Sequence, residues 1–594
     1  MPGRIEDYAL IGDCETAALV DRNGSIDWLC WPRFDSGACF ARLLGTDENG
    51  SWGIEAQEPI VRTRRRYRPR TLILETDIET ADGAFTLIDF MPPRGEASDL
   101  VRLVVGKAGR VKIRSLLRIR FDYGAITPWV SRIEQGITAI AGPDMAVLRS
   151  PAPLREEEQR IVSEFTLSPG ETMPFVLTYS PAYGPVPPSG DPETLLAETD
   201  AFWQEWSAHC NYEGPWADAV LRSHITMKAL TYGPTGGIVA APTTSLPEQI
   251  GGIRNWDYRF CWLRDAALTL LSLMEAGFVD EARAWRDWLL RAAAGNPSQM
   301  QIMYGIAGEH RLPEFELPWL QGYEASRPVR IGNAAHRQFQ LDIFGELTDA
   351  LHVARHTGIP PSEAGWMLEK RLIEFLETVW QEPDEGIWEF RGPRQHFTYS
   401  KVMAWRAVDR TVLSAQEFGL HGPIQHWKEL RQRIHDDVCA KAFDPSCNSF
   451  TQAYESKHLD ASLLLIPMTG FLPPEDPRGK GTVAAVEKYL MVDGFVRRYD
   501  TDTRLDGLPP GEGAFLPCSF WLADNFILQG RHTEAENLFV RLLDLCNDVG
   551  LLAEEYDPAA GRMLGNFPQA FSHLALVHTA RALTDRSPSW KPQR

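Results

Sequence analysis

Two glutamates stand out because each lies beside an aromatic residue in a segment rich in turn-forming residues. Glu389 follows Trp388 in the stretch Gly-Ile-Trp-Glu-Phe, and Glu554 precedes Tyr556 in the stretch Ala-Glu-Glu-Tyr-Asp. Two carboxyl groups on either side of a bond are the usual equipment for cleaving a glycosidic linkage. Either segment alone could equally be a surface loop that happens to contain Glu. Because both lie between helical patterns, far apart in the sequence, we favour a pair of catalytic residues that the fold brings together.

A third candidate segment carries an Arg–Asp pair and a tryptophan. Arg264 and Asp265 can hydrogen-bond adjacent hydroxyls of a sugar, while the indole of Trp262 covers its apolar face. The alternative is that Asp265 only caps a helix and that Arg264 is its ion-pair partner. Arg498, in the stretch Arg-Arg-Tyr-Asp, is a further candidate hydroxyl ligand, although its context alone slightly favours a solvated charge.

The elements that would position these residues show a hydrophobic period of 3.6 from about residue 216 onward, which is typical of amphipathic helices. We expect helices near residues 217–233, 265–277, 280–294, 334–357, 362–381, 399–419, 423–440, 457–467, 481–491, 514–529, 532–547 and 567–584. Asp280 can cap the third helix and Gly295 can end it, while Asn566 with Pro568 opens the last. Six helical hairpins of this kind can close into an (α/α)6 barrel with one helix of each pair inside.

The connectors between these helices alternate in length. The longer ones each precede an even-numbered helix, so they would gather at one end of the barrel, where function usually lies. They are residues 234–264, 296–333, 382–398, 492–513 and 548–566.

The first 180 residues show a period of two instead, which indicates half-buried strands. Five apolar residues fall on odd positions, namely Val111, Ile113, Leu117, Ile119 and Phe121, and the even positions between carry Lys112, Arg114, Arg118 and Arg120. Residues 71–78 and 84–90 predict one hairpin around Asp82-Gly83, and residues 161–167 and 173–179 predict another around Pro169-Gly170. Many short strands predict an antiparallel sandwich.

A stretch rich in Pro and Gly, from 181 to 190, marks the boundary after these strands. We therefore predict a β-sandwich over residues 1–190, a helical linker over 191–215 with its helix near 192–209, and a catalytic barrel over 216–594.

Composition limits the possible partners and location. A chain of 594 residues with 44% hydrophobic and 24% charged residues is expected to fold into two or more globular domains. The net charge of −20 argues against nucleic acid or an anionic membrane as a partner. We find no apolar run long enough to span a bilayer and no apolar region in the first residues of the kind that a secretory signal needs.

The sequence predicts neither a metal site nor a bound cofactor. Its nine Cys contain no CxxC pair and no Cys/His cluster, so we expect reduced thiols and a cytoplasmic protein. His336, His396 and His573 are scattered without metal-ligand spacing, and the Gly-rich pieces 305–308 and 511–513 lack a phosphate-binding motif. Formation of a homo-oligomer is left open.

With these residues in view, the chain resembles glycoside hydrolase family 15, the family of glucoamylases and prokaryotic trehalases, almost from end to end. The stretch Gly24–Ser36 resembles the N-terminal domain of the trehalase-like branch, and the segments around Trp262–Leu268, Gly386–Glu389, Glu554–Asp557 and Gly565–His573 resemble the catalytic domain. The resemblance implies a β-supersandwich followed by an (α/α)6 barrel.

The resemblance also implies roles for single residues. Glu389 matches the general acid, and Glu554 matches the general base. Arg264 and Asp265 match the pair that holds the terminal glucose, and Arg498 matches an Arg that contacts the same sugar. Trp262, Trp388 and Tyr556 are further substrate-binding candidates. Fungal glucoamylases have a second Glu directly after the acid, whereas Phe390 and Arg391 follow here, so the preference for the leaving sugar does not transfer.

We therefore expect an inverting, exo-acting α-glucoside hydrolase that releases β-D-glucose, with α,α-trehalose favoured as its substrate. A glucoamylase or an isomaltose-type α-glucosidase is the main alternative, because trehalose, maltose and isomaltose would all suit a short pocket. A disaccharide phosphorylase and a non-catalytic sugar-binding protein are distant alternatives. No cofactor is needed for hydrolysis, although a dependence on phosphate or Mg²⁺, reported for some trehalase relatives, stays open. The sandwich is expected to be structural, with a loop around Trp28–Arg33 near the rim of the site.

Overall fold

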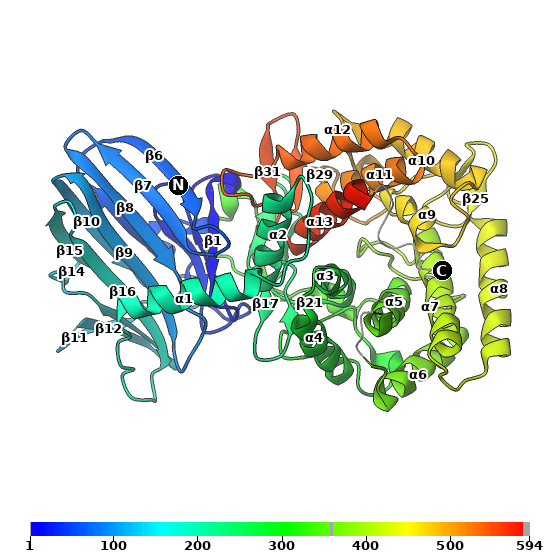
Figure 1. The fold of residues 1–594 in the computed structure, drawn as a ribbon, viewed down its shortest axis with the longest axis horizontal. Coiled ribbons are helices and arrows are strands. Elements are labelled where there is room, and N and C mark those ends of the chain that lie inside the picture. The colour runs from blue at the N-terminus through cyan, green and yellow to red at the C-terminus, as the bar shows by residue number, and fades with distance from the viewer. Residues whose placement is uncertain (1, 135, 357–359, 586–594) are drawn as a thin grey trace.

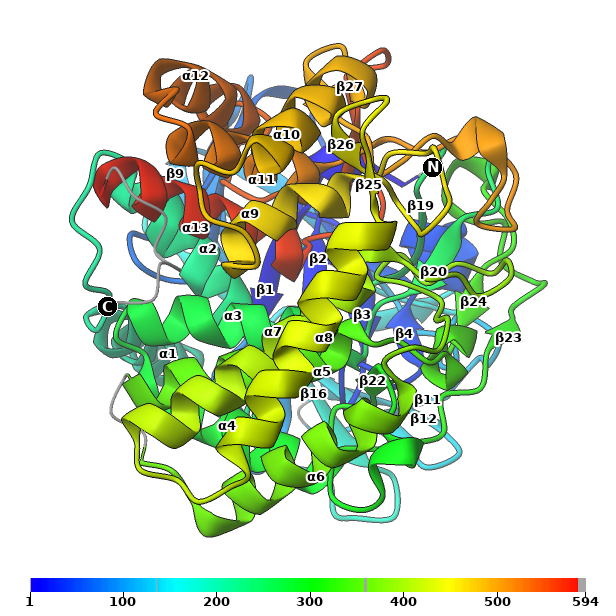
Figure 2. The same ribbon diagram turned by 90° about the vertical axis from the view of Figure 1, so that its right-hand side faces the viewer.

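The computed structural model describes residues 2–134, 136–356 and 360–585. Two parts lie side by side, an N-terminal β-sandwich and a C-terminal ring of helices (Figure 1). Helix α1 (Pro192–Ser207) leads from the sandwich to the ring. Figure 2 shows the ring from its far side, with the sandwich behind it. Among the described helices, none combines the length and the apolar character that a membrane span needs.

The sandwich consists of two eight-stranded antiparallel sheets. One sheet has the order β1 (Ala9–Gly12), β2 (Ala17–Val20), β3 (Ile26–Cys30), β5 (Ser51–Ala56), β10 (Val111–Arg118), β15 (Arg160–Leu167) and β14 (Arg155–Glu157), with β4 (Ala38–Phe40) paired to β3. The other has the order β11 (Trp129–Ile133), β12 (Gly136–Ala141), β13 (Asp144–Arg149), β16 (Thr172–Pro181), β9 (Ser98–Gly109), β8 (Gly83–Phe90), β7 (Leu74–Thr80) and β6 (Ile60–Tyr67). In β10, Val111, Ile113 and Leu117 are buried and Lys112 is exposed, as the period of two predicts.

One of the two predicted hairpins is confirmed and the other is wrong. Strands β7 and β8 pair directly on either side of Asp82. In contrast, β15 pairs with β10 and β14 in one sheet, whereas β16 pairs with β9 and β13 in the other. Strands that face each other across a sandwich core alternate in the same way as paired strands. The pattern therefore cannot distinguish a hairpin from a connection between sheets.

The ring is an (α/α)6 barrel, as predicted. Six helical elements contact one another in a closed inner circle: α3 (Leu263–Glu275), α5 (Asp342–His356), α7 (Thr398–Glu417), a 3-10 helix (Ala461–Leu465) continued by α9 (Ile466–Thr469), α11 (Leu516–Leu528) and α13 (Ala570–Asp585). The outer helices are α2 (Ala217–Ala229), α4 (Val279–Ala292), α6 (Glu363–Val379), α8 (Ile424–Lys441), α10 (Pro477–Tyr489) and α12 (His532–Leu543). The predicted even-numbered helices are the inner ones.

Several predicted helix boundaries are wrong. Helix α4 begins at Val279, so Asp280 lies in its first turn and does not cap it. The predicted helix 334–357 is interrupted, because the N–H of Phe339 and that of Leu341 bond to carboxylates of the 382–398 connector before α5 begins. The last helix, predicted over 567–584 with Asn566 and Pro568 opening it, begins at Ala570. For the helix predicted from 334, the contacts with the 382–398 connector override the local helical pattern.

Candidate active site

Three of the long connectors that precede inner helices line one pocket. The lining includes Glu248, Arg254, Trp256, Tyr258, Trp262, Arg264, Asp265, Ile387, Trp388, Glu389, Arg391, Arg498 and Phe571. A further connector, 548–566, supplies Glu554, which does not itself line the pocket but accepts a hydrogen bond from the lining residue Tyr258. The structure thus brings together the predicted residues of the 234–264, 382–398, 492–513 and 548–566 connectors.

Glu389 lies in a tight turn between α6 and α7. Its backbone N–H donates to the carbonyl of Gly386 (3.1 Å), and its own carbonyl accepts from the side chain of Gln338 (3.1 Å). The φ angle of Glu389 is +60°, in the left-handed region that residues with a Cβ seldom adopt. Such strained residues persist where the surrounding structure holds them, and they cluster at functional sites.

The carboxyl group of Glu389 has two neighbours that lower its pKa, whereas burial raises it. Trp262 Nε1 donates to Oε1 at 2.7 Å, and the guanidinium of Arg264 lies 4.0 Å from the same oxygen. Burial raises the pKa of Glu389 above its usual range, and these two partners only partly offset the rise. A carboxyl group with a raised pKa can donate a proton near neutral pH.

Glu554 immediately precedes the short strand β30 (Glu555–Asp557) and is 1% exposed. Tyr258 donates to its Oε1 at 2.6 Å, and the backbone N–H of Asn566 donates to Oε2 at 3.1 Å. Burial, followed by the charge of Glu248, raises the pKa of Glu554 to about 8. The hydrogen bonds from Tyr258 and Asn566 favour the ionised form and oppose that rise.

The two carboxyl groups do not touch each other but are joined through two aromatic side chains. Tyr258, which binds Glu554, packs edge-on against Trp262, with ring centroids 5.2 Å apart. Trp262 in turn binds Glu389. One glutamate is thus hydrogen-bonded at each end of an aromatic pair that lines the pocket.

Arg264 and Asp265 lie side by side in the first turn of α3. Arg264 Nε contacts Asp265 Oδ1 at 2.7 Å, and Arg264 also donates to the carbonyl of Ile387 at 2.7 Å. The N-cap residue of α3 is Trp262, so the alternative that Asp265 caps this helix is wrong. The ion pair is present, and both of its members line the pocket.

Arg498 is 6% exposed, so the alternative of a solvated charge is wrong. One of its guanidinium nitrogens lies 2.8 Å from Glu248, 2.7 Å from Glu512 and 3.3 Å from Glu555. The three carboxylates are close enough together to hold a metal ion, but the guanidinium already lies among them. In the described chain, His352, His356 and Glu417 form another grouping with ligand atoms within 4.8 Å of one another.

The structure does not bring Tyr556 into the pocket. Side chains alternate along β30, so that Glu555 faces Arg498 while Tyr556 packs against Phe495 with ring centroids 5.7 Å apart. Trp388 does line the pocket and donates through its indole to Asp460 at 2.8 Å.

Sequence reasoning did not select several residues that line the pocket, among them Tyr258, Glu248, Trp256 and Arg391. The two aromatic ones lie in the 255–265 segment, beside residues that were identified. Glu248 and Arg391 had no signal, because an isolated charged residue in a connector resembles any solvated one.

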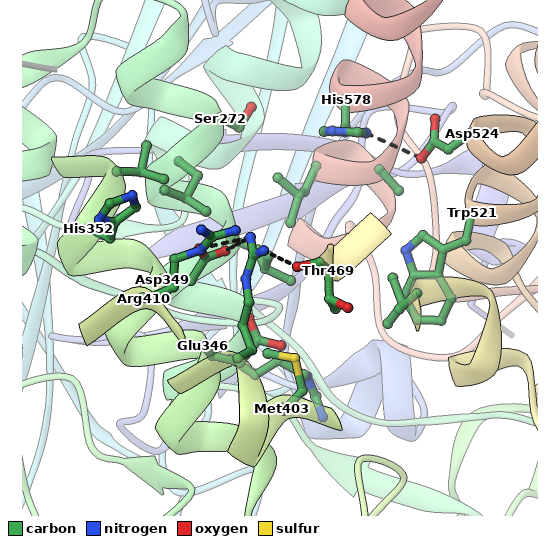
Figure 3. A pocket seen from close by; sticks show the side chains of 18 of the residues that line it. Ser272, Glu346, Asp349, His352, Met403, Arg410, Thr469, Trp521, Asp524 and His578 are labelled. Carbon is green, nitrogen blue, oxygen red and sulfur yellow. Dashed lines mark hydrogen bonds and ion pairs between the residues drawn. The ribbon is translucent and has the colours of Figure 1, made fainter. Parts of the chain in front are cut away.

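A second cavity, of about 310 Å³, lies among the inner helices (Figure 3). It shares Arg264, Ile387 and Phe571 with the first pocket. Several of its titratable side chains contact one another: Asp349 contacts Arg410 at 2.8 Å, and His578 contacts Asp524 at 3.2 Å.

Comparison with known proteins assigns this arrangement to a family. The model described as glycosyl hydrolases family 15 matches residues 214–532 and 526–581, and the model described as trehalase-like, N-terminal matches residues 1–177. This chain belongs to glycosyl hydrolase family 15. It is therefore a glycoside hydrolase, and the non-catalytic alternative is set aside.

Relatives of this family 15 hydrolase match it over nearly its full length. It is 35% identical to a trehalase of Thermoplasma volcanium (98% of this chain, 94% of the relative) and 38% identical to a trehalase of Mycobacterium tuberculosis (97% and 90%). A bacterial glucoamylase complexed with acarbose has a TM-score of 0.74 at 12% identity, over 99% of this chain and 95% of the glucoamylase, and so shares its fold.

Proposed function

We propose that this hydrolase is an inverting α,α-trehalase in which Glu389 is the general acid and Glu554 the general base. The observation that carries the mechanism is the placement of two carboxyl groups at opposite ends of the Tyr258–Trp262 pair. An inverting glycosidase needs roughly 6.5–9.5 Å between its carboxyl groups, because a water molecule must enter between base and sugar. The substrate is supported by the near full-length similarity to trehalases.

Hydrolysis passes through a transition state with positive charge on the sugar ring, and the departing oxygen must gain a proton as the bond breaks. Glu389, whose pKa burial raises, donates that proton. Glu554 removes a proton from the water that attacks the opposite face. Tyr258 donates to Glu554 and fixes the orientation of its carboxyl group. Water and trehalose thereby yield one β-D-glucose and one α-D-glucose, the latter being the leaving sugar.

Arg264 and Asp265 hold the glucose that is attacked. Their side chains are fixed against each other, and Arg264 is fixed again by the carbonyl of Ile387, so little conformational freedom is lost when hydroxyls bind. Contacts to these hydroxyls tighten in the transition state and therefore raise the rate.

The experiment is a comparison of kcat/KM for trehalose, maltose, isomaltose and maltopentaose, with the anomer of newly formed glucose followed by NMR. We expect trehalose to be preferred, and β-glucose and α-glucose to appear in equal amounts. Turnover of trehalose below a hundredth of that of maltose or isomaltose would reject the substrate. Initial release of α-glucose alone would reject inversion.

The same assay, repeated after removal of phosphate and in the presence of EDTA, tests the expectation that hydrolysis needs no cofactor. A phosphorylase would form glucose 1-phosphate and require phosphate. A cytoplasmic location and a homo-oligomeric state are predictions for cell fractionation and light scattering, respectively.

A further inference from the structure

Ile387, Glu389 and Arg391 lie on one short stretch of backbone, and all three line the pocket. The carbonyl of Ile387 accepts from Arg264 (2.7 Å). The side-chain exposure is 11% for Arg264, 20% for Glu389 and 26% for Arg391. Glu389 thus lies between the Arg264–Asp265 pair at the buried end and Arg391 at the more exposed end.

This order assigns a direction to the substrate. An exo-acting hydrolase encloses the terminal sugar, and its acid must reach the oxygen between that sugar and the leaving sugar. With the terminal glucose held by Arg264 and Asp265, the oxygen lies at Glu389. The leaving sugar must then lie on the far side of Glu389, where Arg391 lines the pocket.

The guanidinium of Arg391 is held in place by contacts with two neighbouring side chains. It lies over the ring of Trp256, 4.8 Å from the centroid, and donates to Glu314 Oε2 at 3.3 Å. Trp256 also carries the guanidinium of Arg330 at 4.7 Å from its ring. The backbone N–H of Arg391 donates to the carbonyl of Asp506 at 2.8 Å.

An arginine has five N–H donors in a planar arrangement. The bond to Glu314 involves only Nη2, which leaves donors for the adjacent hydroxyls of a sugar. Because Trp256 and Glu314 fix the plane of the guanidinium, its side-chain entropy is already reduced before a sugar binds. A hydrogen-bond donor of this kind would recognise a hydroxylated leaving group and have little effect on one without hydroxyls.

We propose that Arg391 binds the leaving glucose and that Trp256 and Glu314 position it. This inference rests on the proposed function, because it needs Glu389 as the acid and Arg264–Asp265 as the grip on the other sugar. It makes Arg391 a determinant of which leaving group is accepted, and it places that determinant two residues from the acid, on the same turn.

The test compares a leaving group that carries hydroxyls with one that does not. The leaving group of trehalose is a glucose, which departs after protonation. In contrast, α-D-glucosyl fluoride reacts with water to give β-D-glucose and hydrogen fluoride, so it has no second sugar to bind. We expect Arg391→Ala to lower kcat/KM for trehalose by about 10- to 100-fold, the range for hydrogen bonds to a charged group, and for the fluoride by less than threefold. Arg391→Lys keeps the charge but loses the planar donors, so it should give an intermediate loss on trehalose.

Arg394→Ala is the matched control. Arg394 lies three residues further along, its side chain is 47% exposed, and it contacts Glu385 at 2.9 Å. We expect it to change kcat/KM by less than twofold for both substrates. Should Arg391→Ala fail to fold, Arg391→Met keeps a long side chain beside Trp256 without the guanidinium and serves the same comparison.

Equal losses on trehalose and the fluoride would overturn the inference, since a merely structural role disturbs the site for every substrate. The inference would also be overturned if the activity of Arg391→Ala on trehalose stayed within threefold of wild type. A wild-type enzyme that prefers maltose or isomaltose would instead contradict the proposed trehalase, and the same ratio against the fluoride would then be measured with that disaccharide. The two failures are therefore distinguishable.

Discussion

Burial raises the pKa of both carboxyl groups at the pocket, and their partners differ in kind. Glu389 has an indole N–H and a nearby guanidinium, whereas Glu554 has a phenol, a backbone N–H and a negative neighbour. Because burial raises the pKa of both groups, the two roles are proposed from the match to the family's acid and base and from their positions, with Glu389 lining the pocket and Glu554 behind Tyr258.

Removing either carboxyl group should stop hydrolysis without unfolding the protein. We expect Glu389→Gln to lower kcat at least about 1,000-fold while the KM for trehalose changes little, because the amide is nearly isosteric but cannot give up a proton. Glu554→Ala should be comparably slow and partly rescued by azide as an external nucleophile. Steady-state kinetics and Tm check both. Activity within threefold of wild type for either variant contradicts the assignment.

Substitution of Glu248 tests the role of Glu554 through the pH dependence of kcat/KM. Its charge is the largest contribution after burial to the raised pKa of Glu554. Glu248→Gln removes that charge and leaves Arg498 less neutralised, so both changes favour ionised Glu554 and its pKa should fall. The acid limb of the kcat/KM profile should then move to lower pH. An unchanged limb, or one moved to higher pH, would show that Glu554 does not set it.

Among single residues, the sequence predicted those for which the proposed chemistry allows few residue types, namely two carboxylates and an Arg–Asp pair. It could not show that Arg498 is enclosed by three glutamates that are distant in sequence, nor that alternation along β30 turns Tyr556 away. Those facts depend on pairing between connectors, which no local pattern encodes.

Among the elements, the inner helix α5 carries charged side chains that are buried inside the barrel. Glu346 on α5 is 5% exposed, accepts from Tyr399 at 3.0 Å and lines the second cavity (Figure 3). Burial, followed by the charge of Asp342, raises the pKa of Glu346 to about 8.

This raised pKa makes the stability of the fold depend on pH. An unfolded Glu titrates near pKa 4.3, so between about pH 4.3 and 8 the folded state binds more protons and the free energy of unfolding falls as pH rises. Glu346→Gln, which resembles the neutral acid, should raise Tm, least at pH 5 and most at pH 8 and above. Thermal melts across that range check it. A Tm difference independent of pH would contradict a buried, titrating Glu346.

The period of the hydrophobic pattern predicted the sandwich and the barrel with one helix of each pair inside. It failed where a backbone group bonds outside its own element. The helix expected from 334 is broken because Phe339 and Leu341 donate to Glu385 and Asp384. The hairpin expected at 161–179 is absent because each strand finds its partners in a different sheet.

In the whole molecule, the sandwich supports the site from behind. Trp28 on β3 donates to the carbonyl of Pro242 at 2.8 Å, and the next residue, Thr243, donates to Asn566 at 2.9 Å. Asn566 binds Glu554. The described lining of the active-site pocket contains no sandwich residue, so the expected loop around Trp28–Arg33 supports the catalytic connectors and does not line the pocket.

Trp28→Phe tests this support in the full chain. The ring remains, but the buried carbonyl of Pro242 loses its donor, which costs about 1–3 kcal/mol of stability. We expect a lower Tm together with a several-fold lower kcat, because the disturbance reaches Glu554 through Thr243 and Asn566. Trp129→Phe is the control, since Trp129 on β11 is 79% exposed. Unchanged kcat for Trp28→Phe would show that the sandwich acts on the barrel only through overall stability.

The left-handed backbone of Glu389 has a consequence for how this enzyme can evolve or be engineered. Glycine ordinarily makes a folded chain less stable than alanine does, but at φ +60° the alanine Cβ is strained and the order should reverse, by about 1 kcal/mol. Melts of Glu389→Gly and Glu389→Ala, both inactive, would check this. At this position stability and activity therefore favour different residues, and a screen for heat resistance alone would favour loss of the proposed catalytic acid.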